Sequence, residues 1–246
     1  MTRGIFLATS LVCYGLFLAT FLYLIGFVGG FAVLPRTVDF GPAAPAPLAI
    51  AGDLALIAVF GLQHSVMARP GFKRRWARIV PPVLERSIYV LLASLVLILL
   101  FAGWRPIPIV LWAVADPVGT PILWALFATG WGIVLASTYM INHFELFGLS
   151  QTWAHFRGRQ PGAARFVTPI FYRVVRHPLY SGFLLAFWAT PVMTVGHLVL
   201  ALGMTAYVLI AIWHEERDLV DMFGDEYRDY RARVGMLAPG IGRRSA

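Results

Sequence analysis

Long apolar stretches separated by short polar segments dominate the sequence. The first runs from Ile5 to Leu34 without a charged residue, whereas a membrane-spanning helix needs only about 20 predominantly apolar residues. Further apolar stretches follow at about Leu48–Met67, Ser87–Gly103, Pro117–Ile141, Leu179–Met193 and Leu198–Trp213. This pattern predicts an all-α integral membrane protein with five to six transmembrane helices, because a helix satisfies its own backbone polar groups inside a bilayer.

The polar segments between and after these stretches predict how the helices are connected. Pro191 and the short segment Thr194–His197 separate the last two stretches, which indicates a tight turn and a C-terminal helical hairpin. The segment between Asn142 and Arg176, and the one after Trp213, are polar enough to leave the bilayer. We expect both to form amphipathic helices at the cytosolic face, with an interruption at Gly224 in the second.

Composition and charge agree with a membrane protein and predict its orientation. The chain has 246 residues, of which 59% are hydrophobic and 13% charged, and its net charge is +8. Except for Arg36 and Arg105, all 20 lysine and arginine residues fall on one side of the predicted spans. The positive-inside rule then places both termini in the cytosol. Because the basic residues are distributed among loops, no nucleic-acid partner is expected.

Two isolated residues inside the spans have simple interpretations. Cys13 is the single cysteine of the chain, so it forms no intrachain disulfide. Asp53 lies well inside the second stretch, near its predicted outer end. We expect it to be an interfacial or packing carboxylate rather than part of a transport path.

The segment Arg176-His177-Pro178 is the first candidate for chemistry. Proline is favoured at the first position of a helix, so Pro178 predicts a helix start with His177 as its cap. The free N–H groups of such a start, with Arg176 beside them, suit an anionic group. Gly182, one turn later, permits close approach of a flat ligand or of a neighbouring helix.

Paired carboxylates at Glu215 and Glu216 form the second candidate. An antiparallel hairpin returns them to the membrane face on which Arg176, His177 and Pro178 lie. Either motif alone is ordinary, since the first could be a membrane anchor and the second a solvated helix face. Together, at the spacing of one hairpin, they predict a functional site.

The segment from Thr168 to Pro239 resembles the core of the isoprenylcysteine carboxyl methyltransferase and phospholipid methyltransferase superfamily. The shared features are Arg-His-Pro-x-Tyr at Arg176–Tyr180 and the later Glu215-Glu216. The resemblance implies that S-adenosylmethionine binds there. The cofactor-binding residues it implies are Arg176, His177, Pro178, Tyr180, Gly182, Glu215 and Glu216.

Two upstream segments, Gln63–Pro70 and Tyr139–Leu149, are similar to the bacterial methanethiol S-methyltransferase branch, which shares its amino-terminal layout with NnrU-like membrane proteins. This resemblance implies methyl transfer to a small volatile thiol, methanethiol, in contact with membrane lipids. It also implies one membrane-embedded methyltransferase domain over residues 1–246. Its parts are residues 1–67 with the first two spans, 83–141 with spans three and four, and 168–239 as the cofactor-binding core.

A thiol acceptor requires a group that removes its proton, because the thiolate is the nucleophile. His64 and His143 end two spans at the predicted cytosolic face, and histidine titrates near neutral pH. Asn142 and Glu145 flank His143 and are candidates to orient its ring. The histidines lack the His-x-x-x-His spacing of a zinc site, so no metal is expected.

Four questions stay open at the level of sequence. The same core serves a methyltransferase with a larger lipophilic acceptor, such as an isoprenylcysteine carboxylate or a phospholipid amine. Among functions other than catalysis, the alternative is a non-enzymatic NnrU-like membrane protein. The general base and the oligomeric state are not determined by the sequence.

Overall fold

The computed structural model describes residues 2–159 and 169–243. Thr168, the predicted first residue of the cofactor-binding core, lies outside these residues. The helices are α1 (Thr2–Val28), α2 (Ala46–Ala68), α3 (Pro70–Trp76), α4 (Glu85–Gly103), α5 (Gly119–Ile141), α6 (His143–Leu146), α7 (Leu149–Phe156), α8 (Pro178–Trp188), α9 (Val195–Phe223) and α10 (Asp225–Arg233), with 3-10 turns at Pro82–Leu84 and Ile170–Arg173. The short strands β1 (Val110–Ala113) and β2 (Val192–Thr194) form a two-stranded sheet.

The described helices bear out the predicted membrane fold. Five of them, α1, α2, α4, α5 and α9, are long and apolar enough to cross a membrane. The apolar helix α8 has 11 residues, fewer than the roughly 20 that a span requires. The structure therefore favours five full-length spans over six within the described residues.

The connection between α8 and α9 differs from the predicted turn. The residue before a proline avoids helical geometry, and α8 ends at Trp188, ahead of Pro191. The chain then forms β2 instead of continuing as a helix to Met193. The predicted turn at Thr194–His197 is wrong, because α9 already begins at Val195. The Thr194 hydroxyl caps this helix start by accepting the N–H of His197 at 3.0 Å.

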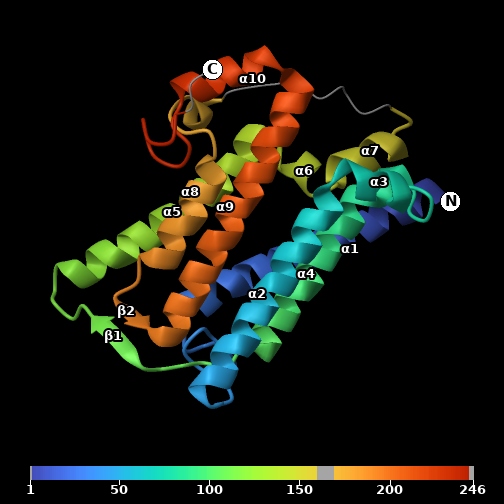
Figure 1. Cartoon of the computed structure of the whole chain (residues 1–246). Coiled ribbons are helices and arrows are strands. Elements are labelled where there is room, and N and C mark those ends of the chain that lie inside the picture. Colours follow the sequence, from blue (N-terminus) through green and yellow to red (C-terminus); the bar gives the residue numbers. More distant parts are fainter. Residues whose placement is uncertain (1, 160–168, 244–246) are drawn as a thin grey trace. The chain divides into compact units, whose positions relative to one another are not determined.

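The chain forms two compact units, and we describe each by itself. The first holds α1 to α4, α6, α7 and the first turn of α9; α4 packs against both α1 and α2 (Figure 1). In this unit Asp53 is fully buried and accepts the N–H of Arg105 at 2.9 Å. Of its two predicted roles, the structure supports the packing carboxylate.

The second unit holds α5, α8, most of α9 and α10. Its main contact joins α5 and α8, which run side by side (Figure 1). The two helices meet at Gly130 and Gly182, where a β-carbon on Gly182 would lie 2.7 Å from the Gly130 carbonyl oxygen. Of the two roles left open for Gly182, the structure shows the close approach of a neighbouring helix.

Hydrogen bonds connect α8 and its preceding residues to α9. The Trp188 indole N–H donates to the Thr205 hydroxyl at 3.0 Å, and Arg176 pairs with Glu216 further along α9. The helices α8 and α9 are therefore neighbours, as the predicted hairpin requires. α9 continues ten residues past the predicted end at Trp213, to Phe223, and the predicted break at Gly224 separates it from α10.

Candidate functional site

The start of α8 is covered by the segment that follows α10. Pro178 is the first residue of α8 and His177 is its N-cap, as predicted. The backbone N–H groups of Arg176 and His177 donate to the carbonyls of Gly235 and Met236, at 2.8 and 3.2 Å. The Ser181 hydroxyl donates to the Leu237 carbonyl at 2.7 Å. The C-terminal segment therefore lies directly on the helix start that the sequence predicted as an anion site.

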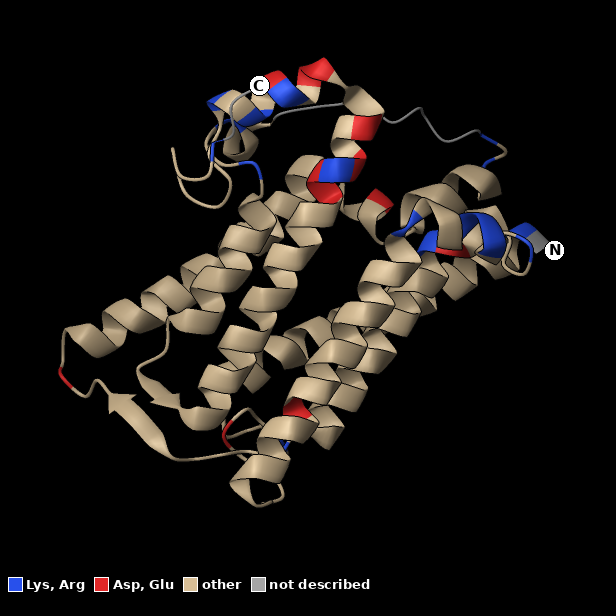
Figure 2. Cartoon of the chain, viewed as in Figure 1, with Lys and Arg blue, Asp and Glu red and all other residues tan. Residues whose placement is uncertain are grey.

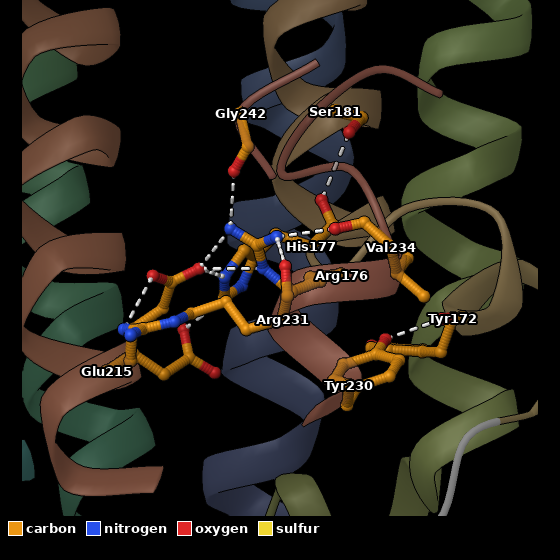
Figure 3. A network of polar contacts seen from close by, with 10 residues as sticks. Tyr172, Arg176, His177, Ser181, Glu215, Tyr230, Arg231, Val234 and Gly242 are labelled. Atoms are coloured by element: carbon orange, nitrogen blue, oxygen red, sulfur yellow. Dashed lines mark hydrogen bonds and ion pairs between the residues drawn. The ribbon is translucent and has the colours of Figure 1, made fainter. Parts of the chain in front are cut away.

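A buried ion pair joins Arg176 to Glu216, and Figure 3 labels Arg176 among its polar contacts. Nη2 and Nε of Arg176 lie 2.7 and 2.8 Å from Oε1 of Glu216, and both side chains are almost fully buried. The same guanidinium donates to three backbone carbonyls beyond α9, those of Arg231, Val234 and Gly242. All three nitrogens of Arg176 thus have protein acceptors.

His177 joins both glutamates to the start of α8. Its Nε2 lies 3.3 Å from Oε1 of Glu216, and its Nδ1 lies 3.8 Å from Oε2 of Glu215. The Glu215 side chain is 45% exposed whereas that of His177 is 4% exposed. The Tyr180 ring lies 5.8 Å from the His177 ring. The structure thus brings together Arg176–Tyr180 and the glutamate pair, as the predicted hairpin implies.

Two buried tyrosines of α10 cover the cluster. Tyr227 and Tyr230 pack with ring centroids 5.8 Å apart, and the Tyr230 hydroxyl donates to the Tyr172 carbonyl (Figure 3). Burial raises the pKa of Tyr230 to about 12, although the nearby Arg176 charge opposes this shift. The hydroxyl therefore stays protonated at neutral pH and remains a donor.

The predicted acceptor residues around His143 lie in the other unit. His143 is the first residue of α6 and is 6% exposed. Its Nε2 lies 2.8 Å from the Tyr14 hydroxyl of α1. Burial lowers the pKa of His143, so its ring is neutral at pH 7. Asn142 and Glu145 are exposed and bond to each other, with Nδ2 of Asn142 donating to Glu145 at 2.7 Å.

His64 contacts the same hydrophobic cluster as His143. Its ring lies 5.4 Å from Phe60 and 5.0 Å from Tyr89, and the Tyr89 hydroxyl donates to its carbonyl at 3.3 Å. Tyr89 belongs to a buried cluster with Met67 and Val90, against which Phe147 packs. The Phe147 ring in turn lies 4.9 Å from the ring of His143. His64 and His143 thus contact the same group of aromatic side chains in the first unit.

Comparison with known proteins places this chain in a family. A family model described as NnrU protein matches residues 54–240. Methanethiol S-methyltransferase of Mycobacterium tuberculosis is 54% identical, with 97% of this chain and 98% of the relative covered. Methanethiol S-methyltransferase of Crocosphaera subtropica is 47% identical, with 100% of this chain and 96% of the relative covered. The chain belongs to the NnrU family.

The chain is also similar to a eukaryotic protein. Nurim of Sus scrofa is 33% identical, with 69% of this chain and 68% of the relative covered. No solved structure matches the chain. The predicted resemblance to the methanethiol S-methyltransferase branch and its NnrU-like layout is confirmed.

Several contacts of Arg176 and of His143 could not be predicted from the sequence of this chain. Apart from Glu216, the acceptors of the Arg176 guanidinium are backbone carbonyls, which every residue possesses. Tyr14 lies in the first apolar helix, far along the chain from its partner His143. Only the fold identifies these contacts, because they join segments that are distant in the sequence.

Proposed function

We propose that this chain transfers the methyl group of S-adenosylmethionine to methanethiol, the acceptor for which its bacterial relatives are named. We place the protein in the bacterial inner membrane with both termini in the cytosol. The observation that carries the proposal is the juxtaposition of His177, Glu215 and Glu216 at the start of α8, in a chain of this family. Surrounding lipid chains suit an acceptor as small and apolar as methanethiol.

The residues of the cluster fit S-adenosylmethionine in different ways. Glu215 is half-exposed, and a carboxylate accepts hydrogen bonds from ribose hydroxyls or from an ammonium group. Tyr180 is partly exposed beside His177 and offers an aromatic face to the sulfonium or the adenine. Arg176 has its donors engaged by the protein, so its role in this proposal is to hold Glu216 and the C-terminal segment in place.

The reaction forms one carbon–sulfur bond and breaks another. The S–H proton of methanethiol leaves to a base, the thiolate attacks the sulfonium methyl carbon, and dimethyl sulfide and S-adenosylhomocysteine are the products. His143 is our candidate for the base, because a histidine whose pKa is lowered by burial is neutral and able to accept a proton. We propose Tyr14 as the group that positions its ring, in addition to the predicted Asn142 and Glu145. His64 is the second candidate base.

The activity is tested directly by incubating the purified protein in detergent with S-adenosylmethionine and methanethiol. We expect dimethyl sulfide, detected by gas chromatography, in proportion to S-adenosylhomocysteine. Binding of S-adenosylmethionine without formation of dimethyl sulfide would instead favour the larger lipophilic acceptor. Absence of both would favour a non-enzymatic protein.

The cofactor site is tested by a matched pair of substitutions in α9. We expect Glu215→Gln to weaken binding of S-adenosylmethionine by about tenfold or more, because it removes a charged hydrogen-bond acceptor. Asp221→Asn is the control, since Asp221 is exposed on the same helix and no role in the cluster is proposed for it. Calorimetric titration measures both affinities. Equal affinities in the two variants would contradict our placement of the cofactor.

A further inference from the structure

A group of basic side chains lies at the connection between the spans α2 and α4. It consists of Arg69, Lys73, Arg74, Arg75 and Arg78, which we call the α3 basic patch (Figure 2). α2 ends at Ala68 and α4 begins at Glu85, so α3 connects two consecutive membrane crossings. A segment in this position is held at the level of the lipid headgroups.

Aromatic packing fixes α3 to the first unit. The rings of Phe72 and Trp76 stack at 5.5 Å, and both side chains pack against the buried cluster of Met67, Tyr89 and Val90. The charged side chains of α3 therefore project from an anchored helix. A fixed array of charges loses less conformational entropy when it binds a ligand than a flexible one does.

The charges of the patch are only partly neutralised by the protein. Lys73 lies 3.9 Å from Glu85, and Nε of Arg69 donates to the Ser65 carbonyl at 3.3 Å. Arg74, Arg75 and Arg78 are exposed, and no acidic side chain in residues 2–159 and 169–243 forms an ion pair with them. Three exposed guanidinium groups thus receive no counterion from the described residues.

We propose that the α3 basic patch binds the headgroups of anionic phospholipids. Guanidinium groups form bidentate hydrogen bonds with phosphate oxygens, and basic clusters next to a membrane span attract anionic lipids. Ile79, which directly follows Arg78, is 76% exposed and offers an apolar contact for the lipid chains. The patch is thus complementary to an anionic lipid in charge and in polarity. Lipid binding at this patch does not depend on the proposed methyl transfer.

The test is a titration of phosphatidylglycerol into the full-length protein in detergent, followed by native mass spectrometry. Phosphatidylcholine with the same acyl chains is the comparison lipid. We expect the wild type to prefer phosphatidylglycerol and to lose this preference as salt is raised. The triple variant R74Q/R75Q/R78Q is expected to bind phosphatidylglycerol at least about tenfold more weakly, and R75Q alone about fivefold more weakly.

The control is a second triple variant that removes the same number of charges elsewhere. R217Q/R228Q/R233Q changes exposed arginines that already have partners: Arg217 stacks on Trp213, Arg228 pairs with Asp225, and Arg233 donates to the Asp229 carbonyl. We expect this variant to bind phosphatidylglycerol like the wild type. A wild type without lipid preference, an unaffected R74Q/R75Q/R78Q, or an equal loss in the control would each overturn the proposal.

Discussion

At the residue scale, Arg176 is the most highly connected side chain of the candidate cofactor site. Its guanidinium bonds to Glu216 of α9 and to carbonyls of Arg231, Val234 and Gly242. The planar fork of arginine suits this arrangement, because five N–H groups diverge in fixed directions. Arg176 thereby connects the start of α8, the end of α9 and the C-terminal segment.

Replacing Glu216 with glutamine should destabilise the protein strongly. Glu216→Gln leaves the Arg176 charge buried without its counterion, which typically costs about 3–5 kcal/mol. We expect a corresponding fall in the midpoint of thermal unfolding, measured in detergent. Glu215→Gln is the control and should change the midpoint little, because the Glu215 side chain is 45% exposed. A midpoint for Glu216→Gln as high as that of the control would contradict the structural role of the pair.

The buried ring of His143 predicts a dependence of stability on pH. Burial lowers the pKa of His143 in the folded protein below its ordinary value of about 6.5. Below about pH 6.5 the unfolded chain therefore takes up a proton more readily than the folded one, so stability is lost as the pH falls. Above this range both states are neutral at this residue, and its contribution is constant.

The measurement is the difference between the thermal midpoints at pH 7.5 and pH 5.5. We expect this difference to be smaller in His143→Gln than in the wild type, because glutamine does not titrate. His155→Gln is the matched control, since the His155 ring stacks on Phe6, whereas the His143 ring bonds to Tyr14. An unchanged difference in His143→Gln would show that another group governs the acid response.

At the scale of elements, the contact between α5 and α8 depends on two glycines. A β-carbon on Gly182 would lie 2.7 Å from the carbonyl oxygen of Gly130 and 2.9 Å from the backbone nitrogen of Val134. Both neighbours are backbone atoms, which cannot rotate away as a side chain can. Small residues permit this kind of close packing between membrane helices.

Gly182→Ala should therefore force α5 and α8 apart. We expect a loss of roughly 1–3 kcal/mol in stability, as for other overpacked interiors. Gly132→Ala is the control on α5, because a β-carbon there meets no atom within 4 Å, and alanine is the better helix former. Denaturation in a mild detergent measures both. If Gly182→Ala were as stable as Gly132→Ala, the close approach would be wrong.

At the scale of the whole molecule, the span α4 separates two accessible segments. Ala77 precedes it and is exposed, and Val118 follows it and is 65% exposed. The distribution of basic residues predicts that Ala77 faces the cytosol and Val118 the opposite side. Cys13 is buried, so an engineered cysteine is easily distinguished from it.

Cysteine labelling tests this orientation. In a Cys13→Ala background, Val118→Cys should react with a membrane-impermeant maleimide added to spheroplasts. Ala77→Cys should react only after the membrane is permeabilised. The reverse pattern would invert the orientation and move the α3 basic patch to the outer face.

Sequence patterns predicted much of the fold and part of the candidate site. Five of the six apolar stretches correspond to described helices that could cross a membrane, because length and hydrophobicity decide what crosses a bilayer. The α8 start at Pro178 and the break at Gly224 follow from the backbone properties of proline and glycine. The sixth full-length span was not borne out, since hydrophobicity alone does not reveal that the chain forms β2 after Trp188.

The sequence by itself determined the membrane fold, the hairpin and the pairing of Arg176-His177-Pro178 with Glu215-Glu216, because local hydrophobicity, proline geometry and charge set these features. Only the tertiary structure decided what each group contacts. It turned Arg176 inward to backbone carbonyls, placed Gly182 against Gly130, and joined His143 to Tyr14. The physical reason is that these contacts connect segments distant along the chain, and their geometry exists only after the helices have packed.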